Sequence, residues 1–278
     1  MFDTSTFLRT LSDFYREHGR HDMSWRQPEA DGSYNPYKIL VSEIMLQQTQ
    51  VGRVEPKYHE FLGHFPTVDA LAQASLGGVL NDWSGLGYNR RAKYLWQAAK
   101  QVVGEYGGRF PRTPSELQTL SGVGPNTAGA IMAYAYDMPV VYIETNIRTV
   151  LIYHLFNNRD SVTDKELREV LQVIVRQLPG NDTGLSYREL YYAFMDYGSH
   201  LKKTIGNLNR ISTVYSKQST FAGSRREIRG KVIKLLRDGS CPISELVSVI
   251  EDDRLDSILG DLTSEGLIVR SGDIYSLE

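Results

Sequence analysis

The chain has 278 residues, with 31 basic and 33 acidic side chains and a formal net charge of −2 at pH 7. This length predicts about two domains, and an apolar fraction of 41% is enough for a folded core, which argues against disorder. A single cysteine, Cys241, excludes a disulfide framework, a cysteine-based zinc site and a four-cysteine iron–sulfur cluster within one chain.

Helical periodicity dominates residues 1–200. Glycine and proline separate the segments, and Thr113–Glu116 is typical of a capping box with Pro114 at the first helical position. We expect no strand before residue 260, so this part is predicted to be all-α. The predicted helical segments are 6–19, 36–51, 54–65, 68–75, 78–87, 90–107, 115–122, 127–136, 144–156, 164–178 and 186–201.

The pattern changes after residue 200. Residues 201–224 are polar and read as irregular, and helical segments then follow at 226–239, 244–251 and 253–266. Residues 267–270 and 274–277, around a Ser-Gly-Asp turn, predict a β-hairpin. Three helices and a hairpin are the winged-helix order. Because the third helix and the hairpin are acidic, we weigh an interaction or packing role beside DNA binding.

The small net charge hides an uneven distribution. Residues 1–200 carry a net −3, residues 201–240 a net +8, and residues 241–278 a net −7. A basic block beside an acidic tail predicts contact with a polyanion. A solvated linker whose helix pairs with the tail is the alternative interpretation.

Membrane insertion and secretion are not predicted. No apolar run approaches the roughly 20 residues that cross a bilayer. The N-terminus carries charges of both signs on an amphipathic pattern, unlike a secretory signal. We expect a soluble, cytoplasmic protein without a membrane partner.

Two glycines, Gly122 and Gly124, lie between two predicted helices. They permit a tight turn, and the N-terminal amides of the following helix can hold a phosphate. This pattern favours a helix-hairpin-helix clamp on a DNA backbone, although an ordinary helical turn gives the same letters. A nucleotide P-loop is excluded because no Gly-Lys-Ser/Thr follows.

Two glutamates stand out on helical segments. Glu43 lies in the apolar stretch 39–46, where burial raises a carboxyl pKa and suits a general acid. Glu144 precedes a helical segment, where it can also serve simply as a cap. Together they suit glycosidic cleavage, with one acid protonating the leaving group and one carboxylate stabilising the oxocarbenium ion.

The combination of SEIMLQQTQV, GLGY and LSGVG, in nearly continuous register over residues 22–200, resembles the helix-hairpin-helix DNA glycosylase superfamily. The sequence is most similar to its A/G-specific adenine DNA glycosylases. The resemblance implies an all-α, two-lobed helix-hairpin-helix DNA glycosylase fold, followed here by a small C-terminal winged-helix-like module. It also implies binding of double-stranded DNA with a mispaired or damaged base, which is flipped from the stack. A monomer is expected.

The resemblance assigns roles residue by residue. Glu43 corresponds to the acid that protonates adenine, Glu144 to the catalytic carboxylate and Asn146 to the asparagine beside it. Gln48 and Thr49 match residues that contact the opposite base, Tyr88 a wedge beside the flipped base, and Trp25–Arg26 a pocket element. Asn126 lines the same pocket. The residues expected to contact DNA are Gln47, Gly122, Gly124, Thr127, Lys202, Lys203 and Arg210.

The chain departs from the family pattern at four points. Glu144 replaces the family's aspartate and places its carboxylate one methylene further out. Asn126 stands where the bifunctional branch has a Schiff-base lysine, so we predict a monofunctional enzyme. The iron–sulfur cysteines are missing, with Lys202 near the first of them, and so is the C-terminal nudix-like domain. We expect no obligatory cofactor, and only a monovalent cation at the hairpin carbonyls.

The predicted domains are 1–222 and 223–278, the first with a six-helix lobe at about 31–143 and a second lobe from 1–30 plus 144–222. Adenine excision opposite 8-oxoguanine or guanine is the leading hypothesis. Excision of thymine, uracil or a modified base is the second, favoured by Glu144, Asn126 and the missing nudix-like domain. A catalytically inactive DNA-binding module is the third.

Overall fold

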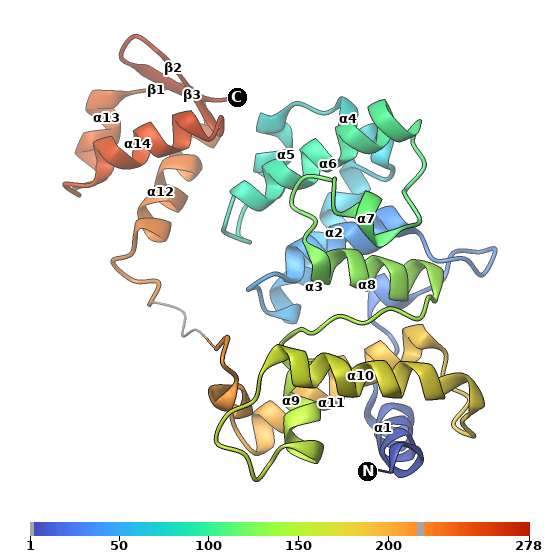
Figure 1. Ribbon diagram of the computed structural model, residues 1–278. Helices are drawn as coiled ribbons and strands as arrows, with labels where there is room; N and C mark the ends of the chain where they lie inside the picture. Colours follow the sequence, from blue (N-terminus) through green and yellow to red (C-terminus); the bar gives the residue numbers. More distant parts are fainter. Residues whose placement is uncertain (1–2, 216–219) are drawn as a thin grey trace. The chain divides into compact units, whose positions relative to one another are not determined.

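A computed structural model describes residues 3–215 and 220–278 (Figure 1). Its internal contacts divide the chain into two compact units. Among the basic residues of the 201–240 block, Lys217 lies outside the described residues. Unit 1 comprises the described residues of Met1–Ile39, Arg112–Gln118 and Val123–Lys217, and unit 2 those of Leu40–Pro111, Thr119–Gly122 and Gln218–Glu278.

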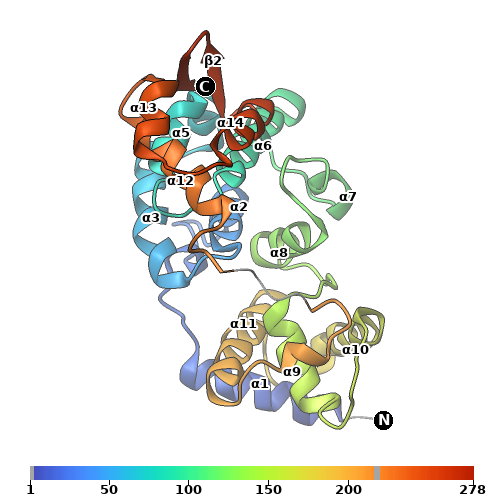
Figure 2. The ribbon, with the colours of Figure 1, turned by 90° about the vertical axis from the view of Figure 1, so that its left-hand side faces the viewer.

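Unit 1 is built around the helix α11 (Tyr187–Thr204), which packs against α9 (Thr145–Leu155), α1 (Thr4–His18) and α8 (Pro125–Tyr136) (Figures 1 and 2). Side-chain caps fix the starts of α11 and α1. Ser186 and Glu189 form a capping box at α11, and Asp3 accepts from the first amides of α1. The remaining elements are η1 (Ser24–Arg26), α7 (Pro114–Leu117), α10 (Asp164–Gln177), η2 (Leu178–Gly180) and η3 (Leu208–Ile211).

Unit 2 receives the chain through α2 (Pro36–Leu46), whose last residues belong to it. Its apolar core includes Phe61 and Trp83, which meet edge to face with ring centroids 6.1 Å apart. The long helix α6 packs against α4 and α5 and ends at Gly107 in the left-handed conformation. The helices are α3 (Val51–His64), α4 (Val68–Gln73), α5 (Leu76–Asp82) and α6 (Arg90–Tyr106).

The C-terminal module has the winged-helix order, as the sequence predicts. Its sheet has the strand order β1-β3-β2 with antiparallel neighbours, and Arg270 lies opposite Tyr275 in the hairpin. Buried leucine and isoleucine side chains from all three helices form its core. The elements are α12 (Arg225–Arg237), β1 (Cys241–Pro242), α13 (Ile243–Val249), α14 (Leu255–Ser264), β2 (Ile268–Ser271) and β3 (Ile274–Leu277).

Two expectations for these regions were wrong. The strand β1 precedes residue 260, with Cys241 opposite Tyr275 and Pro242 opposite Ile274. Two residues are too short for a period-two pattern, so the alternation that reveals a strand has no room to appear. The stretch 201–224 is not wholly irregular either, because α11 continues to Thr204 and η3 follows.

Helices dominate the described chain and the sheet is confined to the C-terminal module, which confirms the predicted all-α fold. The contact-based units group α8 with unit 1 and the module with unit 2, whereas the sequence places 31–143 in one lobe. The predicted domain boundaries therefore stay predictions. Among the described residues, no helix combines the length and apolarity that a membrane span requires.

Candidate active site

Glu43 is a half-buried carboxylate on an otherwise apolar stretch of α2. Its neighbours Ser42 and Ile44 are buried, with 1% of each exposed. The apolar residues of the helix pack inward and hold the backbone, so the glutamate occupies the boundary of the core. The position suits a proton donor that must reach substrate from a rigid helix.

The turn after α2 carries three of the predicted contact residues, Gln47, Gln48 and Thr49. Gln48 has a φ of 56°, in the left-handed region that side chains other than glycine seldom adopt. Tyr88, in the loop after α5, also has a left-handed backbone conformation, with a φ of 50°. Strained backbone of this kind persists only where its surroundings impose it, and it concentrates at functional sites.

Arg91 imposes this geometry from the first turn of α6. Its side chain is 8% exposed, and it donates hydrogen bonds to both loops at once. On the α2 side the acceptors are the carbonyls of Ile44 (2.8 Å), Met45 (3.0 Å) and Gln47 (2.6 Å) and the Thr49 hydroxyl (3.1 Å). On the other side they are the carbonyls of Leu86 (3.3 Å) and Gly87 (3.1 Å).

Two guanidinium groups of unit 2 lie close to the Tyr88 ring. The guanidinium carbon of Arg91 lies 5.4 Å from the Tyr88 ring centroid and that of Arg226 lies 5.2 Å from it. Arg226 also donates to the Tyr88 hydroxyl. Unit 2 thus gathers the predicted residues Gln47, Gln48, Thr49 and Tyr88 around one buried arginine.

The glycine hairpin has the backbone that the motif predicts. Gly122 has a φ of 76°, and a Cβ there would lie 2.7 Å from the Cβ of Tyr94, so only glycine fits. Gly124 is the N-cap of α8, and within the described residues no side chain caps its first amides. Both glycines are exposed, whereas Thr127 is buried. Exposed amides at a helix N-terminus are suited to a phosphate.

Glu144 caps α9 in unit 1, as the simpler interpretation of the sequence predicts. Its carboxylate accepts from the N–H of Asn146 at 3.2 Å. Burial raises the pKa of Glu144 above its ordinary value, although hydrogen bonds from Asn146 and the charges of Arg148 and Lys202 oppose the shift. The carboxylate is therefore fixed in direction and poorly solvated.

Close packing fixes the backbone around Glu144. The Asn126 side chain donates to the carbonyl of Ile143 at 2.8 Å, which anchors the residue before Glu144 to α8. A Cβ on Gly198 of α11 would lie 2.4 Å from the carbonyl oxygen of Asn146, so α11 and the start of α9 touch backbone to backbone. Unit 1 thus brings the predicted residues Asn126, Glu144 and Asn146 together.

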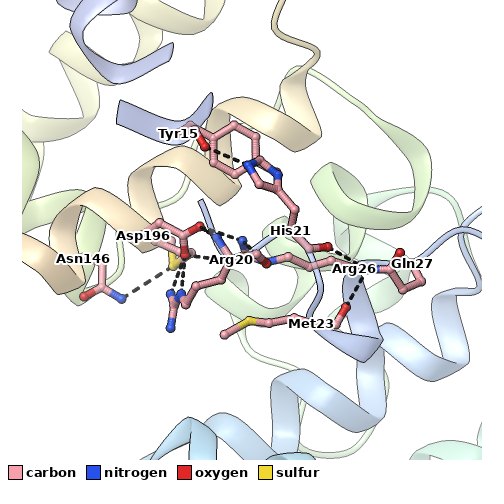
Figure 3. Close-up of polar contacts among 9 residues, drawn as sticks. Tyr15, Arg20, His21, Met23, Arg26, Gln27, Asn146 and Asp196 are labelled. Atoms are coloured by element: carbon pink, nitrogen blue, oxygen red, sulfur yellow. Dashed lines mark hydrogen bonds and ion pairs between the residues drawn. The ribbon is translucent and has the colours of Figure 1, made fainter. Parts of the chain in front are cut away.

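Arg26 belongs to a buried ion-pair network (Figure 3). It donates to both carboxylate oxygens of Asp196 at 2.8 and 2.9 Å, and the side chain of Arg20 reaches the same group at 2.6 Å. Burial raises the pKa of Asp196, but the bonds and charges of the two arginines outweigh it and hold that pKa below its ordinary value. The network anchors the Trp25–Arg26 element, with Trp25 buried, against α11.

The basic side chains at the end of α11 face solvent. Lys202, Lys203 and Arg210 are all exposed. The segment that carries Arg210 is anchored by the buried Asn209, which donates to the Thr149 hydroxyl at 2.9 Å. A main-chain bond from Val162 to the carbonyl of Ile211 (2.9 Å) holds it from the other side.

Sequence reasoning missed Arg91 and Asp196. Arg91 is one of two consecutive arginines at the start of a helical segment, where an exposed position is the ordinary expectation. Asp196 lies in an aromatic helical stretch in which a single acid carries no motif. Only the fold shows that each is a buried charge that binds several partners.

Comparison with known proteins places these features in a family. Residues 41–177 match the HhH-GPD superfamily base excision DNA repair protein family. The adenine DNA glycosylase of Mycolicibacterium smegmatis is 31% identical over 277 residues, which cover 92% of this chain and 91% of that protein. The adenine DNA glycosylase of Rattus norvegicus is 42% identical over 153 residues, 54% of this chain and 30% of the rat protein.

Among solved structures, a thermostable thymine-DNA glycosylase is similar, with a TM-score of 0.57 and 26% identity. The match covers 70% of this chain and 86% of that one. An endonuclease III bound to DNA, at 17% identity and a TM-score of 0.54, shares the fold.

Arg91→Met removes the donors that join the two loops while keeping the apolar stem. Each buried carbonyl left without a donor costs about 1–3 kcal/mol, so we expect a loss of about 3 kcal/mol or more in the free energy of unfolding, measured by urea denaturation. Arg90→Met is the matched control. Because Arg90 is exposed, this substitution should change the free energy of unfolding by about 1 kcal/mol or less. Equal effects of the two substitutions would contradict the role given to Arg91.

Proposed function

The chain belongs to the adenine DNA glycosylase family of the helix-hairpin-helix base excision repair superfamily, and we propose that it removes adenine mispaired with 8-oxoguanine or guanine in double-stranded DNA. One observation carries the choice of substrate. Arg91 joins two loops directly after the helix that bears Glu43. One is the Gln47–Thr49 turn, whose Gln48 and Thr49 are assigned to the base opposite adenine, and the other carries Tyr88, assigned to the wedge beside the flipped base.

The first chemical step requires a better leaving group than the adenine anion. Glu43 donates a proton to the purine ring, so the base departs as a neutral molecule. Its position on α2, with buried neighbours on both sides, restricts the motion of the carboxyl group. The bond between the base and C1′ then breaks towards a cationic sugar.

The second carboxylate, Glu144, acts on the cationic sugar. Glu144 is ionised and stabilises the oxocarbenium ion, or attacks it, before water completes an abasic site. The extra methylene relative to aspartate is compensated by anchoring, since the carboxylate accepts from Asn146 and the preceding carbonyl is held by Asn126. Because Asn126 has no amine, no Schiff base forms and the strand stays intact.

Thymine opposite guanine is the second candidate substrate. A solved structure with 26% identity and a TM-score of 0.57 is named a thymine-DNA glycosylase. The match to this chain covers 86% of that structure. Neutral Asn126 and the longer Glu144 are the pocket positions at which this chain departs from the adenine pattern. The two candidates differ in the base released, so one assay separates them.

Single-turnover base release from a duplex panel tests the proposal. The panel holds adenine opposite 8-oxoguanine, guanine and cytosine, and thymine, uracil and hypoxanthine opposite guanine. We expect adenine release, with strand breaks only after alkali. Release of thymine or uracil instead would establish the second candidate, and breaks without alkali would contradict the assignment of Asn126.

Glu43→Gln should abolish excision while DNA binding persists. The amide keeps the shape and hydrogen-bonding capacity of the side chain but has no proton to give the base. Base release and duplex affinity are measured on the same preparation. Excision at the wild-type rate by Glu43→Gln would remove the general-acid role from this residue.

The pH profile follows from the raised pKa of Glu144. Because the carboxylate must be ionised, base release should fall as the pH is lowered, with a midpoint above the ordinary glutamate value of about 4.3. Glu144→Gln, which can still cap α9, should be slow and should lose this acid limb. A wild-type acid limb retained in Glu144→Gln would assign the titration to another group.

Gly198→Ala tests whether backbone packing positions Glu144. The new methyl group would overlap the Asn146 carbonyl and displace the start of α9. A displacement of about 1 Å can lower the rate roughly a hundredfold, so the single-turnover rate should fall by about that factor with DNA affinity retained. The control is Gly104→Ala on α6, where the methyl group meets open space. An unchanged rate in Gly198→Ala would refute the positioning.

A further inference from the structure

A basic cleft of about 880 Å³ lies within unit 2. One wall is α12 of the module, and the other is formed by the loop that carries Tyr88 together with the start of α6. Arginine and lysine supply eight of its lining residues, and Asp261 and Glu265 are its two acids. Its floor includes Gln47, Gln48 and Tyr88. The cleft thus includes Gln48, which is assigned to the opposite base, and Tyr88, which is assigned to the wedge beside the flipped base.

One face of α12 lines this cleft. The residues follow helical spacing, and the apolar Ile233 and small Gly230 lie between the cations. Lys231 lies off this face and pairs with Glu227 at 3.0 Å. The cations that α12 contributes are Arg225, Arg226, Arg229, Lys234 and Arg237.

The basic side chains of the cleft differ in whether a carboxylate pairs with them. Arg90 from α6 and Arg229 from α12 both bind the Glu265 carboxylate, so side chains from the two walls reach one anion. By contrast, Lys234 and Arg237 are exposed, and no carboxylate of the described residues forms an ion pair with either. Lys234 and Arg237, the latter of which donates to the Ser84 hydroxyl, can therefore reach a phosphate without breaking an ion pair.

The other surfaces of the module are poor sites for DNA. The helix α14, third in the winged-helix order, contains Asp256 and Asp261 and no basic residue. The hairpin tip carries Asp273 beside Arg270. At the mouth of the cleft, by contrast, Phe221 is 60% exposed and offers an aromatic face on which a base can stack.

We infer that the α12 cleft binds the sugar–phosphate backbone of the strand opposite the excised base, with Lys234 and Arg237 as its phosphate contacts. The module reaches DNA through its first helix. The strand assignment rests on the proposed function, because it follows from the role of Gln48, which is assigned to contact with the opposite base. The binding of DNA in the cleft rests on the charge and geometry of unit 2 alone.

The test is the salt dependence of duplex binding, measured by fluorescence anisotropy on the full chain. Lys234→Gln with Arg237→Gln should weaken binding on the order of tenfold and lower the salt slope by about 1.8, since each lost phosphate contact contributes about 0.9. The matched control, Lys231→Gln with Arg270→Gln, removes the same charge from the same module outside the cleft. It should retain the wild-type slope. Equal slopes in the two double variants would overturn the inference.

A second arm identifies the strand. Uncharged methylphosphonates are placed beside the mispair in either strand of an adenine:8-oxoguanine duplex. In the opposite strand they should weaken wild-type binding and leave the Lys234→Gln, Arg237→Gln variant unaffected. The same pattern from the adenine strand would overturn the strand assignment. Since the readout is affinity for uncleaved DNA, a failure of adenine release leaves both arms interpretable.

Discussion

Arg91 holds two loops in backbone conformations that are strained. The left-handed conformations of Gln48 and Tyr88 are unfavourable by themselves, so unrestrained loops would leave them. Arg91 ties both loops to one guanidinium, whose acceptors include the last carbonyls of α2. Those carbonyls are the negative end of the helix dipole and need donors in any case.

Among the described residues, no carboxylate forms an ion pair with the buried Arg91. Burial lowers the pKa of Arg91 to about 10, yet the group stays charged at neutral pH. The backbone carbonyls that accept its hydrogen bonds are neutral dipoles, and they stabilise the guanidinium charge in place of a carboxylate. Asp196 presents the opposite arrangement in unit 1, where a buried carboxylate is neutralised by Arg20 and Arg26. Each unit therefore fixes some of its candidate site residues through one buried charge with several partners, Arg91 for the two loops of unit 2 and Asp196 for the Trp25–Arg26 element of unit 1.

The sequence predicted what depends on local periodicity or on a motif. The helices, the glycine hairpin and the hairpin of the module are of this kind, and so is the capping position of Glu144. It could not predict Arg91 or Asp196, since their burial depends on where distant segments meet. The strand β1 was not predicted for another reason. Its two residues are too few to show the alternation of buried and exposed side chains that identifies a strand. The role of Gly198 is visible only as a backbone contact with Asn146.

Ordinary hydrogen bonds anchor the segment that follows α11. Asn209 reaches Thr149, and Val162 pairs with the Ile211 carbonyl, so the segment after α11 is anchored to α9 and to the start of α10. Each such bond contributes only about 1 kcal/mol. The segment can therefore bring Arg210 near α11 but is a weak brace for a strand of DNA. The helix α12 is the better-supported element for phosphate contacts, because its Arg229 shares the Glu265 carboxylate with Arg90 of α6 and its buried residues pack into the core of the module.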